Sequence, residues 1–306
     1  MLRLTSPDEA RRWCAECRAR GARTRSAPAP GLAPTLGFVP TMGALHEGHL
    51  GLVRRAAREC AKTCVSIFVN PLQFDDPGDF ERYPRDFEGD ARQLESVGCH
   101  MVFTGTLQGF FPGLVGESGE FGAALVDPGP MAAGLEGEFR PGHFAGMATI
   151  VERLFELVEP DRAYFGQKDF QQALIVTGIA RRRGRPEIVV CPTAREPSGL
   201  ALSSRNALLS AAERTSALGV SRALRRAREL WDAGERHAAP LARAMRAEIE
   251  AAGLGLEYAT VRDPGGWTAG EPAGALERAV ALVAARSGRV RLIDNLRLAP
   301  RDPSLP

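Results

Sequence analysis

The residues best suited to chemistry are two histidines, His46 and His49, which stand three residues apart beside a glycine turn. Apolar residues at 36–39 predict a strand, residues 43–48 predict the turn, and apolar residues recur at helical spacing from Leu50 onward. The first N–H groups of a helix have no partner within it, and the helix dipole is positive there, so the junction suits a phosphate. Two imidazoles on one face of the entering turn can donate hydrogen bonds to phosphate oxygens.

Two other interpretations of the histidine pair stay open. A zinc pair on a helix normally has the spacing His-Glu-x-x-His, whereas this chain has His-Glu-Gly-His at 46–49, which disfavours a metal site. Glycine and proline also punctuate purely structural turns. A four-thiolate zinc site is disfavoured too, because its candidate ligands lie in an amphipathic helix pattern and at the start of a buried strand. Those candidates are Cys14, Cys17, Cys60 and Cys64.

Further polar residues follow other predicted strands. Gln73 comes after the β-rich run 63–69, and Lys168 and Gln172 follow a later strand. In an open parallel sheet ligands bind at the carboxyl ends of the strands, so these side chains should face the same crevice as the histidines. The loop 192–206 adds serines and an arginine, which supply hydroxyl, N–H and guanidinium donors for phosphates. Taken singly, such residues are more often ordinary turn residues.

The predicted elements alternate between helices and strands, which is typical of an α/β fold with a parallel sheet. Helices are expected at 6–22, 88–97 and 147–158, and strands at 36–39, 63–69, 100–104 and 187–191. Asp90, on the second helix, could approach a metal-bound phosphate or be a solvated carboxylate. The glycine-rich stretch 105–142 is typical of a functional loop region, and the Pro/Ala-rich stretch 26–34 predicts a surface loop.

A chain of 306 residues exceeds one typical domain, so two domains are expected. After residue 210 the composition shifts toward Ala, Arg and Leu. This part predicts helices at 211–233 and 239–252 and strands at 257–262, 279–286 and 289–295. We therefore expect an α/β domain at 1–193 and a smaller α+β domain at 194–306.

Charge and hydropathy narrow the class of protein. The formal net charge is +2, and basic residues are spread along the chain without an aromatic-studded stripe, so no nucleic-acid partner is expected. The start of the chain has no apolar core of signal-peptide length, and no apolar run is long enough to cross a bilayer. Six cysteines in such a chain do not form a disulfide framework. The sequence predicts a soluble cytoplasmic protein with no membrane partner.

Taken together, these segments resemble one family, pantothenate synthetase, also called pantoate–β-alanine ligase. The matching pieces cover nearly the whole chain. They are PTMGALHEGHL at 40–50, SIFVNPLQF at 66–74, YPRD at 83–86, RPGHFAGM at 140–147, FGQKDFQQ at 165–172, GLALSSRN at 199–206 and RLIDN at 291–295. The histidine pair alone would suggest only the wider group of nucleotidyltransferases and class I synthetases.

The resemblance implies a Rossmann-like catalytic domain with a smaller C-terminal domain, in a homodimer. It implies that pantoate and ATP first give pantoyl adenylate and pyrophosphate, after which the amine of β-alanine displaces AMP. A carboxylate is a poor acyl electrophile, so adenylation supplies the leaving group, and the protein must mainly align reactants and stabilise charge at the α-phosphate. ATP is then a substrate, and Mg²⁺ is expected to offset phosphate charge.

By the same resemblance, His46 and His49 contact the ATP phosphates, and His49 is the proton donor of the first step. Lys168 and Arg205 are the other expected catalytic residues and hold the β and γ end of ATP together with the neighbouring serines. The ATP site is expected to include Met42, Gly43, Ala44, Leu45, His46, Glu47, Gly48, His49, Gly166, Gln167, Lys168, Asp169, Ala194, Leu202, Ser203, Ser204 and Arg205.

Pantoate and β-alanine are expected at Gln73 and Gln172, and Asp90 is the candidate metal ligand. The chain departs from the family pattern at three positions, where a carboxylate near the nucleotide or metal is lost: Gln167 replaces Glu, Ser198 replaces Asp, and Gly89 takes a place that is often acidic. Two alternatives stay open. One is a related nucleotidyltransferase or ligase acting on another carboxylate or amine, and the other is a nucleotide-binding homologue with impaired catalysis.

Overall fold

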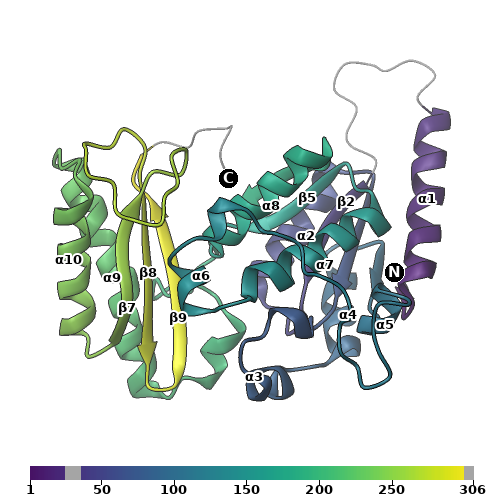
Figure 1. Ribbon diagram of the computed structural model, residues 1–306, viewed down its shortest axis with the longest axis horizontal. Coiled ribbons are helices and arrows are strands. Elements are labelled where there is room, and N and C mark those ends of the chain that lie inside the picture. The colour runs from purple at the N-terminus through teal and green to yellow at the C-terminus, as the bar shows by residue number, and fades with distance from the viewer. Residues whose placement is uncertain (25–35, 300–306) are drawn as a thin grey trace. The chain divides into compact units, whose positions relative to one another are not determined.

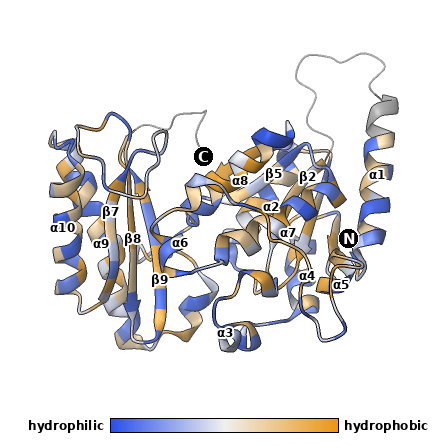
Figure 2. Cartoon of the chain, viewed as in Figure 1, coloured by the Kyte–Doolittle hydropathy of each residue, from blue (hydrophilic) through white to orange (hydrophobic). Residues whose placement is uncertain are grey.

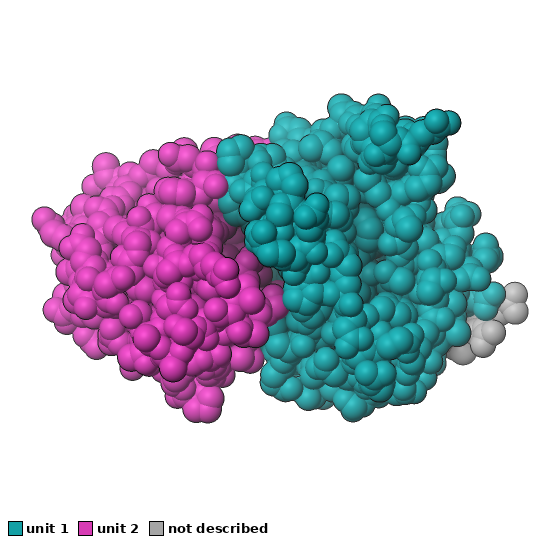
Figure 3. All heavy atoms as spheres, turned by 90° about the horizontal axis from the view of Figure 1, so that it is seen from below, with its two compact units in different colours: residues 1–128, 140–165, 175–191 teal, residues 129–139, 166–174, 192–306 magenta. Residues whose placement is uncertain are grey.

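The computed structural model describes residues 1–24 and 36–299, and the chain divides into two compact units. Unit 1 comprises residues 1–128, 140–165 and 175–191, and unit 2 comprises residues 129–139, 166–174 and 192–306 (Figure 3). The stretch predicted to be a surface loop, 26–34, lies outside the described residues. Among the helices that the structure describes, none has the length and apolar character needed to cross a membrane.

Unit 1 is built on a sheet whose described strands follow the order β1-β4-β3-β2-β5-β6, of which Figure 1 labels the adjacent strands β2 and β5. The strands are β1 (Leu2–Leu4), β2 (Leu36–Thr41), β3 (Lys62–Ile67), β4 (Met101–Phe103), β5 (Arg162–Gly166) and β6 (Glu187–Cys191). The pairs β1–β4, β4–β3, β3–β2 and β2–β5 are parallel. The predicted α/β fold with a parallel sheet is confirmed. Thr41 pairs with Ile67, so β2 and β3 end level with each other.

Helices cover this sheet because its central strands are apolar on both faces. Phe38, Val65 and Val102 are fully buried. The longer helices are α1 (Pro7–Thr24), α2 (Glu47–Glu59), α4 (Phe87–Ser96), α7 (His143–Val158) and α8 (Phe170–Arg183). Short helical turns lie in the connections, namely η1 (Pro71–Gln73), α3 (Pro77–Arg82) and α5 (Leu107–Phe110).

Unit 2 contains an antiparallel sheet with two long helices, so the predicted smaller α+β domain is confirmed. Its strands are β7 (Gly255–Arg262), β8 (Val280–Ser287) and β9 (Val290–Arg297), and its helices are α9 (Ala211–Asp232) and α10 (Ala238–Ala251). Leu224 of α9, Leu241 of α10 and Val283 of β8 share one buried cluster. Figure 2 shows β8 as hydrophobic along most of its length, which fits a central strand buried by the helices.

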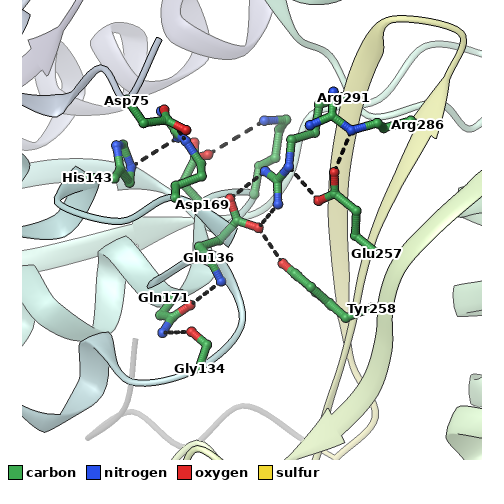
Figure 4. A network of polar contacts seen from close by, with 12 residues as sticks. Asp75, Gly134, Glu136, His143, Asp169, Gln171, Glu257, Tyr258, Arg286 and Arg291 are labelled. Atoms are coloured by element: carbon green, nitrogen blue, oxygen red, sulfur yellow. Dashed lines mark hydrogen bonds and ion pairs between the residues drawn. The ribbon is translucent and has the colours of Figure 1, made fainter. Parts of the chain in front are cut away.

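Two earlier segments also belong to unit 2, unlike the predicted division into 1–193 and 194–306. They are residues 129–139, with η2 (Pro130–Ala132) and α6 (Glu136–Phe139), and residues 166–174. Leu135 and Phe170 are buried in one cluster with Val280 of β8. Arg291 of β9 binds both carboxylate oxygens of Glu136 at 2.6 Å (Figure 4). These contacts explain why both segments pack with the C-terminal sheet.

Two helices begin earlier than predicted. Helix α2 starts at Glu47 rather than at Leu50, because the His46 side chain caps it. Helix α7 starts at His143 rather than at Met147, after Gly142 turns the chain with a φ of 81°. Strand β1 and helix α3 were not predicted, since elements of 3 and 6 residues carry little periodicity.

Candidate active site

The loop between β2 and α2 is held from both sides. The Oγ1 of Thr41 donates to a backbone carbonyl of β3 at 2.8 Å and accepts from the N–H of Gly43 at 3.2 Å. Asp90 of α4 accepts from the N–H of Ala44 and from that of Leu45, both at 2.9 Å. Gly43 has a φ of 86°, a conformation that favours glycine. These bonds fix the loop that carries the two histidines.

His46 and His49 form a reciprocal cap at the start of α2. The N–H of Gly48 donates to Nδ1 of His46 at 3.1 Å, and the N–H of His46 donates to Nδ1 of His49 at 3.3 Å. The ring centroids lie 4.1 Å apart, so the two imidazoles share one face, as their spacing predicted. A neutral imidazole that accepts at Nδ1 carries its hydrogen on Nε2, so both rings are Nε2–H donors. The Gly48 N–H, expected to face a phosphate, donates to an imidazole instead.

Asp90 has a structural role in this loop. The residue is 3% exposed, and each of its carboxylate oxygens accepts one loop N–H. Burial raises the pKa of its carboxyl group, and the N–H groups of Leu45 and Ala44 act in the opposite direction. Among the described residues, no group of three His, Cys, Asp or Glu side chains could hold a metal ion. These residues therefore do not fit a metal site built by the protein, and the metal role of Asp90 stays a prediction.

Two of the departures from the family pattern serve local contacts. A Cβ at Gly89 would lie 2.0 Å from Oδ2 of Asp86, the residue that caps α4 by accepting from the Gly89 N–H at 2.8 Å. Ser198 donates its hydroxyl to Glu196 at 3.4 Å within its own turn. A larger side chain at position 89 would have to displace the α4 cap.

Gln73 of η1 is fixed beside the β2–α2 loop. Its Nε2 lies 2.9 Å from Sδ of Met42, and its Oε1 accepts from Nδ2 of Asn70 at 3.1 Å. Its carbonyl oxygen accepts from Nδ1 of His143 at 2.8 Å and from Nη2 of Arg140 at 3.4 Å. Met42 belongs to the same loop as the histidines. Unit 1 therefore brings the candidate pantoate residue next to the candidate phosphate loop.

The start of α7 supports Gln73, and the sequence reasoning gave its residues no role of their own. The carbonyl oxygen of Gly146 accepts from Nδ2 of Asn70 at 3.1 Å. A Cβ at Gly146 would lie only 1.8 Å from the carbonyl oxygen of Leu72 in η1, so the close approach requires glycine. The signal was present in the segment RPGHFAGM at 140–147, where His143 and Gly146 stand three residues apart.

A second group of candidate residues is assembled in unit 2, around Lys168. Its Nζ lies 3.6 Å from Oδ1 of Asp169. Nδ2 of Asn295, on β9, donates to the carbonyl oxygens of Gln167 and Lys168, both at 2.9 Å. In return, Nε2 of Gln167 donates to Oδ1 of Asn295 at 3.1 Å. Gln167, the third departure from the family pattern, is therefore a hydrogen-bond donor to β9.

The loop 194–206 is also ordered within unit 2. The N–H of Leu202 donates to the carbonyl of Ala194 at 2.9 Å. Ser203 then caps the helical turn η3 (Ser204–Leu208) by accepting from the N–H of Arg205 at 3.2 Å. The predicted hydroxyl and guanidinium groups thus stand on a defined turn.

The predicted site residues fall into two locally assembled groups, one in each unit. Unit 1 holds residues 42–49, Gln73 and Asp90, and unit 2 holds residues 166–169, Gln172, Ala194 and residues 202–205. That both groups bind one triphosphate stays a prediction. Glu47, predicted at the ATP site, forms an exposed ion pair with Arg54, whose hydrogen bond lowers the pKa of the Glu47 carboxyl group.

A parallel sheet whose histidine-capped loop follows the carboxyl end of β2, with an added antiparallel domain, defines an α/β protein of the nucleotide-binding class. Within that class, the chain belongs to the pantoate–β-alanine ligase family, because the model of the family described as pantoate-beta-alanine ligase matches residues 5–297. The pantothenate synthetase of Rubrobacter xylanophilus is 46% identical over 305 residues, which cover 96% of this chain and 98% of that protein. That of Gluconobacter oxydans is 47% identical over 268 residues, which cover 87% of this chain and 94% of that protein.

Solved structures agree with this assignment. The crystal structure of pantothenate synthetase from Thermus thermophilus is similar with a TM-score of 0.83 and 40% identity, covering 98% of this chain and 100% of that one. The pantoate–β-alanine ligase of Francisella tularensis, described as complexed with beta-gamma ATP and β-alanine, has a TM-score of 0.72 and 30% identity, covering 97% of this chain and 98% of that one.

Proposed function

We propose that this enzyme joins pantoate to β-alanine with ATP, forming pantothenate, AMP and pyrophosphate through pantoyl adenylate. Membership of the ligase family over residues 5–297 supports this reaction. The observation that carries it in the structure is local to unit 1. There the reciprocal cap of His46 and His49 belongs to the same loop as Met42, which contacts Gln73 at 2.9 Å. Donors for phosphate and an amide for a hydroxy acid thus stand side by side.

The reaction has two steps. In the first, a carboxylate oxygen of pantoate forms a bond to the α-phosphorus of ATP, and the bond to pyrophosphate breaks. In the second, the neutral amine of β-alanine bonds to the acyl carbon, AMP leaves with the bonding pair of electrons, and the nitrogen loses a proton. Neither step needs a protein nucleophile, so the protein acts by aligning reactants and by stabilising charge on the phosphates.

The proposed roles follow the donors that each segment offers. The Nε2–H groups of His46 and His49 donate to ATP phosphate oxygens, and His49 is the proton donor as the first step proceeds. Lys168 and Arg205, with the backbone and hydroxyl donors of Ser203 and Ser204, hold the β and γ phosphates. The remaining predicted contacts with ATP keep the loops 42–49, 166–169 and 194–205 against the nucleotide.

Gln73 and Gln172 are proposed to bind pantoate or β-alanine through their amides. We propose further that Mg²⁺ reaches the enzyme bound to ATP rather than to a carboxylate cluster. Both oxygens of Asp90 accept backbone N–H groups, and the described residues offer no three-ligand cluster. Mg²⁺ commonly keeps several waters and takes its other ligands from substrate phosphates, which suits such a site.

A homodimer and a cytoplasmic location are also proposed. The homodimer rests on the family resemblance, and sedimentation equilibrium of the purified chain at several concentrations tests it. A monomer at micromolar concentration would contradict it. The cytoplasmic location is supported by the six cysteines, which lie within the described residues as thiols outside any disulfide, five of them buried, as in a reducing compartment.

The test of the reaction is an AMP-release assay with pantoate and β-alanine omitted in turn. We expect AMP and pyrophosphate only when pantoate is present, and pantothenate only after β-alanine is added. AMP release that does not depend on pantoate, or that requires another carboxylate or amine, would show that the substrates differ from those proposed. ATP binding measured by calorimetry without any AMP release would favour the impaired homologue.

Two substitutions test the proposed roles. His49→Ala and Lys168→Ala should each lower kcat by about a hundredfold if these groups stabilise charge in the transition state. The chain has one other lysine, the exposed Lys62, so Lys62→Ala is a matched control that should keep wild-type activity. His237 is exposed, so His237→Ala is the matched control for His49→Ala and should also keep wild-type activity. Folded His49→Ala or Lys168→Ala protein with an unchanged kcat would refute the corresponding role.

A further inference from the structure

Strand β9 carries two adjacent polar residues that are almost completely buried. Asp294 is 4% exposed and Asn295 is 2% exposed, although β9 lies at the edge of the three-stranded sheet. Burying a polar group costs free energy unless the group is hydrogen-bonded, so the hydrogen-bond partners of Asp294 and Asn295 indicate the role of these two side chains. Both sets of partners lie in unit 2.

Asn295 binds the peptide backbone around Lys168. Both hydrogens of its Nδ2 are used, one toward the carbonyl of Gln167 and one toward that of Lys168, each at 2.9 Å. Its Oδ1 accepts from Nε2 of Gln167 at 3.1 Å. Two consecutive carbonyl groups therefore converge on one amide nitrogen. This arrangement fixes the orientation of the peptide from which the Lys168 side chain departs.

Asp294 binds the other candidate loop of unit 2. Its carboxylate binds Nη1 of Arg195 at 2.5 Å and Nη2 at 3.0 Å, and Nη1 of the same guanidinium donates to the carbonyl of Gly199 at 3.2 Å. The N–H of Asn295 donates to Asp294 at 2.7 Å. Burial raises the pKa of the Asp294 carboxyl group, while Arg195 and the charge of Lys168 act to lower it. Two neighbouring residues thus tie the Lys168 loop and the 194–202 loop to one strand.

We propose that Asn295 is a positioning residue that acts through Lys168, holding its ammonium group in place for the ATP phosphates, while Asp294 holds the loop that leads to Arg205. This inference rests on the proposed function. An asparagine is required at position 295 because the site needs two donors toward carbonyls and one acceptor toward Gln167. An aspartate of the same shape would set a carboxylate against two carbonyl oxygens. Glu at position 167 would likewise place an acceptor opposite Oδ1 of Asn295.

The test is a double-mutant cycle between Asn295→Asp and Lys168→Ala, read as kcat of pantoate-dependent AMP release and as the dissociation constant of ATP. If Asn295 acts through Lys168, Asn295→Asp should lower kcat by about tenfold or more in the wild-type background and by less than about twofold when Lys168 is already alanine. The KM for pantoate should stay within about twofold, because the side-chain bonds of Asn295 go to Gln167 and to the carbonyl of Lys168 rather than to the proposed pantoate residues Gln73 and Gln172. Equal losses of kcat in both backgrounds would overturn the proposal.

Two further variants separate positioning from stability. Ser287→Ala, on β8, removes another buried side-chain bond to a backbone carbonyl, at 3.0 Å, and should lower Tm without changing kcat. Gln167→Met removes only the Gln167 donor and should give a smaller loss of kcat that also vanishes in the Lys168→Ala background. It replaces Asn295→Asp in the cycle if that variant does not fold. A loss of kcat in Ser287→Ala as large as that in Asn295→Asp would overturn the proposal.

Failure of the proposed function is recognised separately. Wild-type protein that binds ATP but releases no AMP with pantoate would refute the ligase reaction, and the cycle would then be read on ATP binding alone. In that case Asn295→Asp must still weaken ATP binding in the wild-type background and not in the Lys168→Ala background. ATP binding that is unchanged by Asn295→Asp, or absent from the wild type, would overturn the positioning role.

Discussion

Replacing Gly146 with alanine should destabilise unit 1 and weaken pantoate binding together. The Cβ of alanine would lie 1.8 Å from the carbonyl oxygen of Leu72, whereas Cβ atoms essentially never come within 3.0 Å of such an atom. The difference means that α7 and η1 must separate by about 1.2 Å. The obstacle is backbone rather than a flexible side chain, so no rotamer change relieves it.

The magnitude follows from what that separation breaks. Forcing an extra methyl into a packed interface costs about 1–3 kcal/mol. Nδ2 of Asn70 would also lose its buried acceptor on Gly146, at a cost of about 1–3 kcal/mol. Against these losses, alanine inside a helix stabilises the folded state by about 0.5–1 kcal/mol relative to glycine. We therefore expect a net loss of about 1–5.5 kcal/mol in the free energy of unfolding. Because η1 carries Gln73, the KM for pantoate should rise about tenfold, as for one lost hydrogen bond.

The assay is urea unfolding followed by steady-state kinetics, with Gly178→Ala as the matched control. Gly178 also lies inside a helix, α8, but outside that helix's own backbone the nearest atom that the structure describes would be 3.8 Å from a Cβ there, at Nη1 of Arg182. This control should gain about 0.5–1 kcal/mol of stability. A Gly146→Ala protein whose urea midpoint matches or exceeds that of Gly178→Ala would refute the close approach of α7 and η1.

Two more predictions follow from buried groups. Arg291→Met should cost about 3–5 kcal/mol in urea unfolding, because Glu136 and Glu257, whose side chains are each 10% exposed, lose their shared guanidinium. The exposed pair of Arg226 and Glu229 gives the control, since Arg226→Met should change stability by about 0–1 kcal/mol. A loss of under 1 kcal/mol for Arg291→Met would show that the ion pair does not hold unit 2. Burial raises the pKa of the Cys99 thiol to about 12, so the reactive thiolate is scarce at pH 8 and increases tenfold per pH unit toward that value. Iodoacetamide and mass spectrometry should find native Cys99 unmodified at pH 8 while the partly exposed Cys17 reacts, and rapid modification of Cys99 would contradict this burial.

Local patterns in the chain were sufficient to predict the fold class and the shared face of the two histidines. Strands β2 and β3 are apolar runs, and helices α4 and α9 have apolar residues at helical spacing, so both kinds of element follow from periodicity. The shared face of His46 and His49 follows from their spacing alone. Their reciprocal cap does not, because it depends on which imidazole nitrogen meets each N–H group.

Contacts between residues far apart in the chain were not predictable in this way. Asp90 was expected either near a metal, which stays a prediction, or in solvent, and its bonds to two N–H groups of a loop 46 and 45 residues earlier were not foreseen. Gln167 was expected at the ATP site, in place of a carboxylate, and its bond to Asn295, which lies 128 residues later, was not predicted. A one-dimensional pattern carries no information about such pairs, since they exist only after the elements have packed.

The sequence by itself determined the family, the parallel sheet and the chemical groups offered for phosphate, because these depend on residue types and short spacings. Only the tertiary structure decided which unit the segments 129–139 and 166–174 join, and which backbone groups Asp90, His143 and Asn295 hold. The physical reason is that the hydrophobic burial of Leu135 and Phe170 against β8 determines which unit their segments join, although both segments precede the rest of unit 2 in the chain.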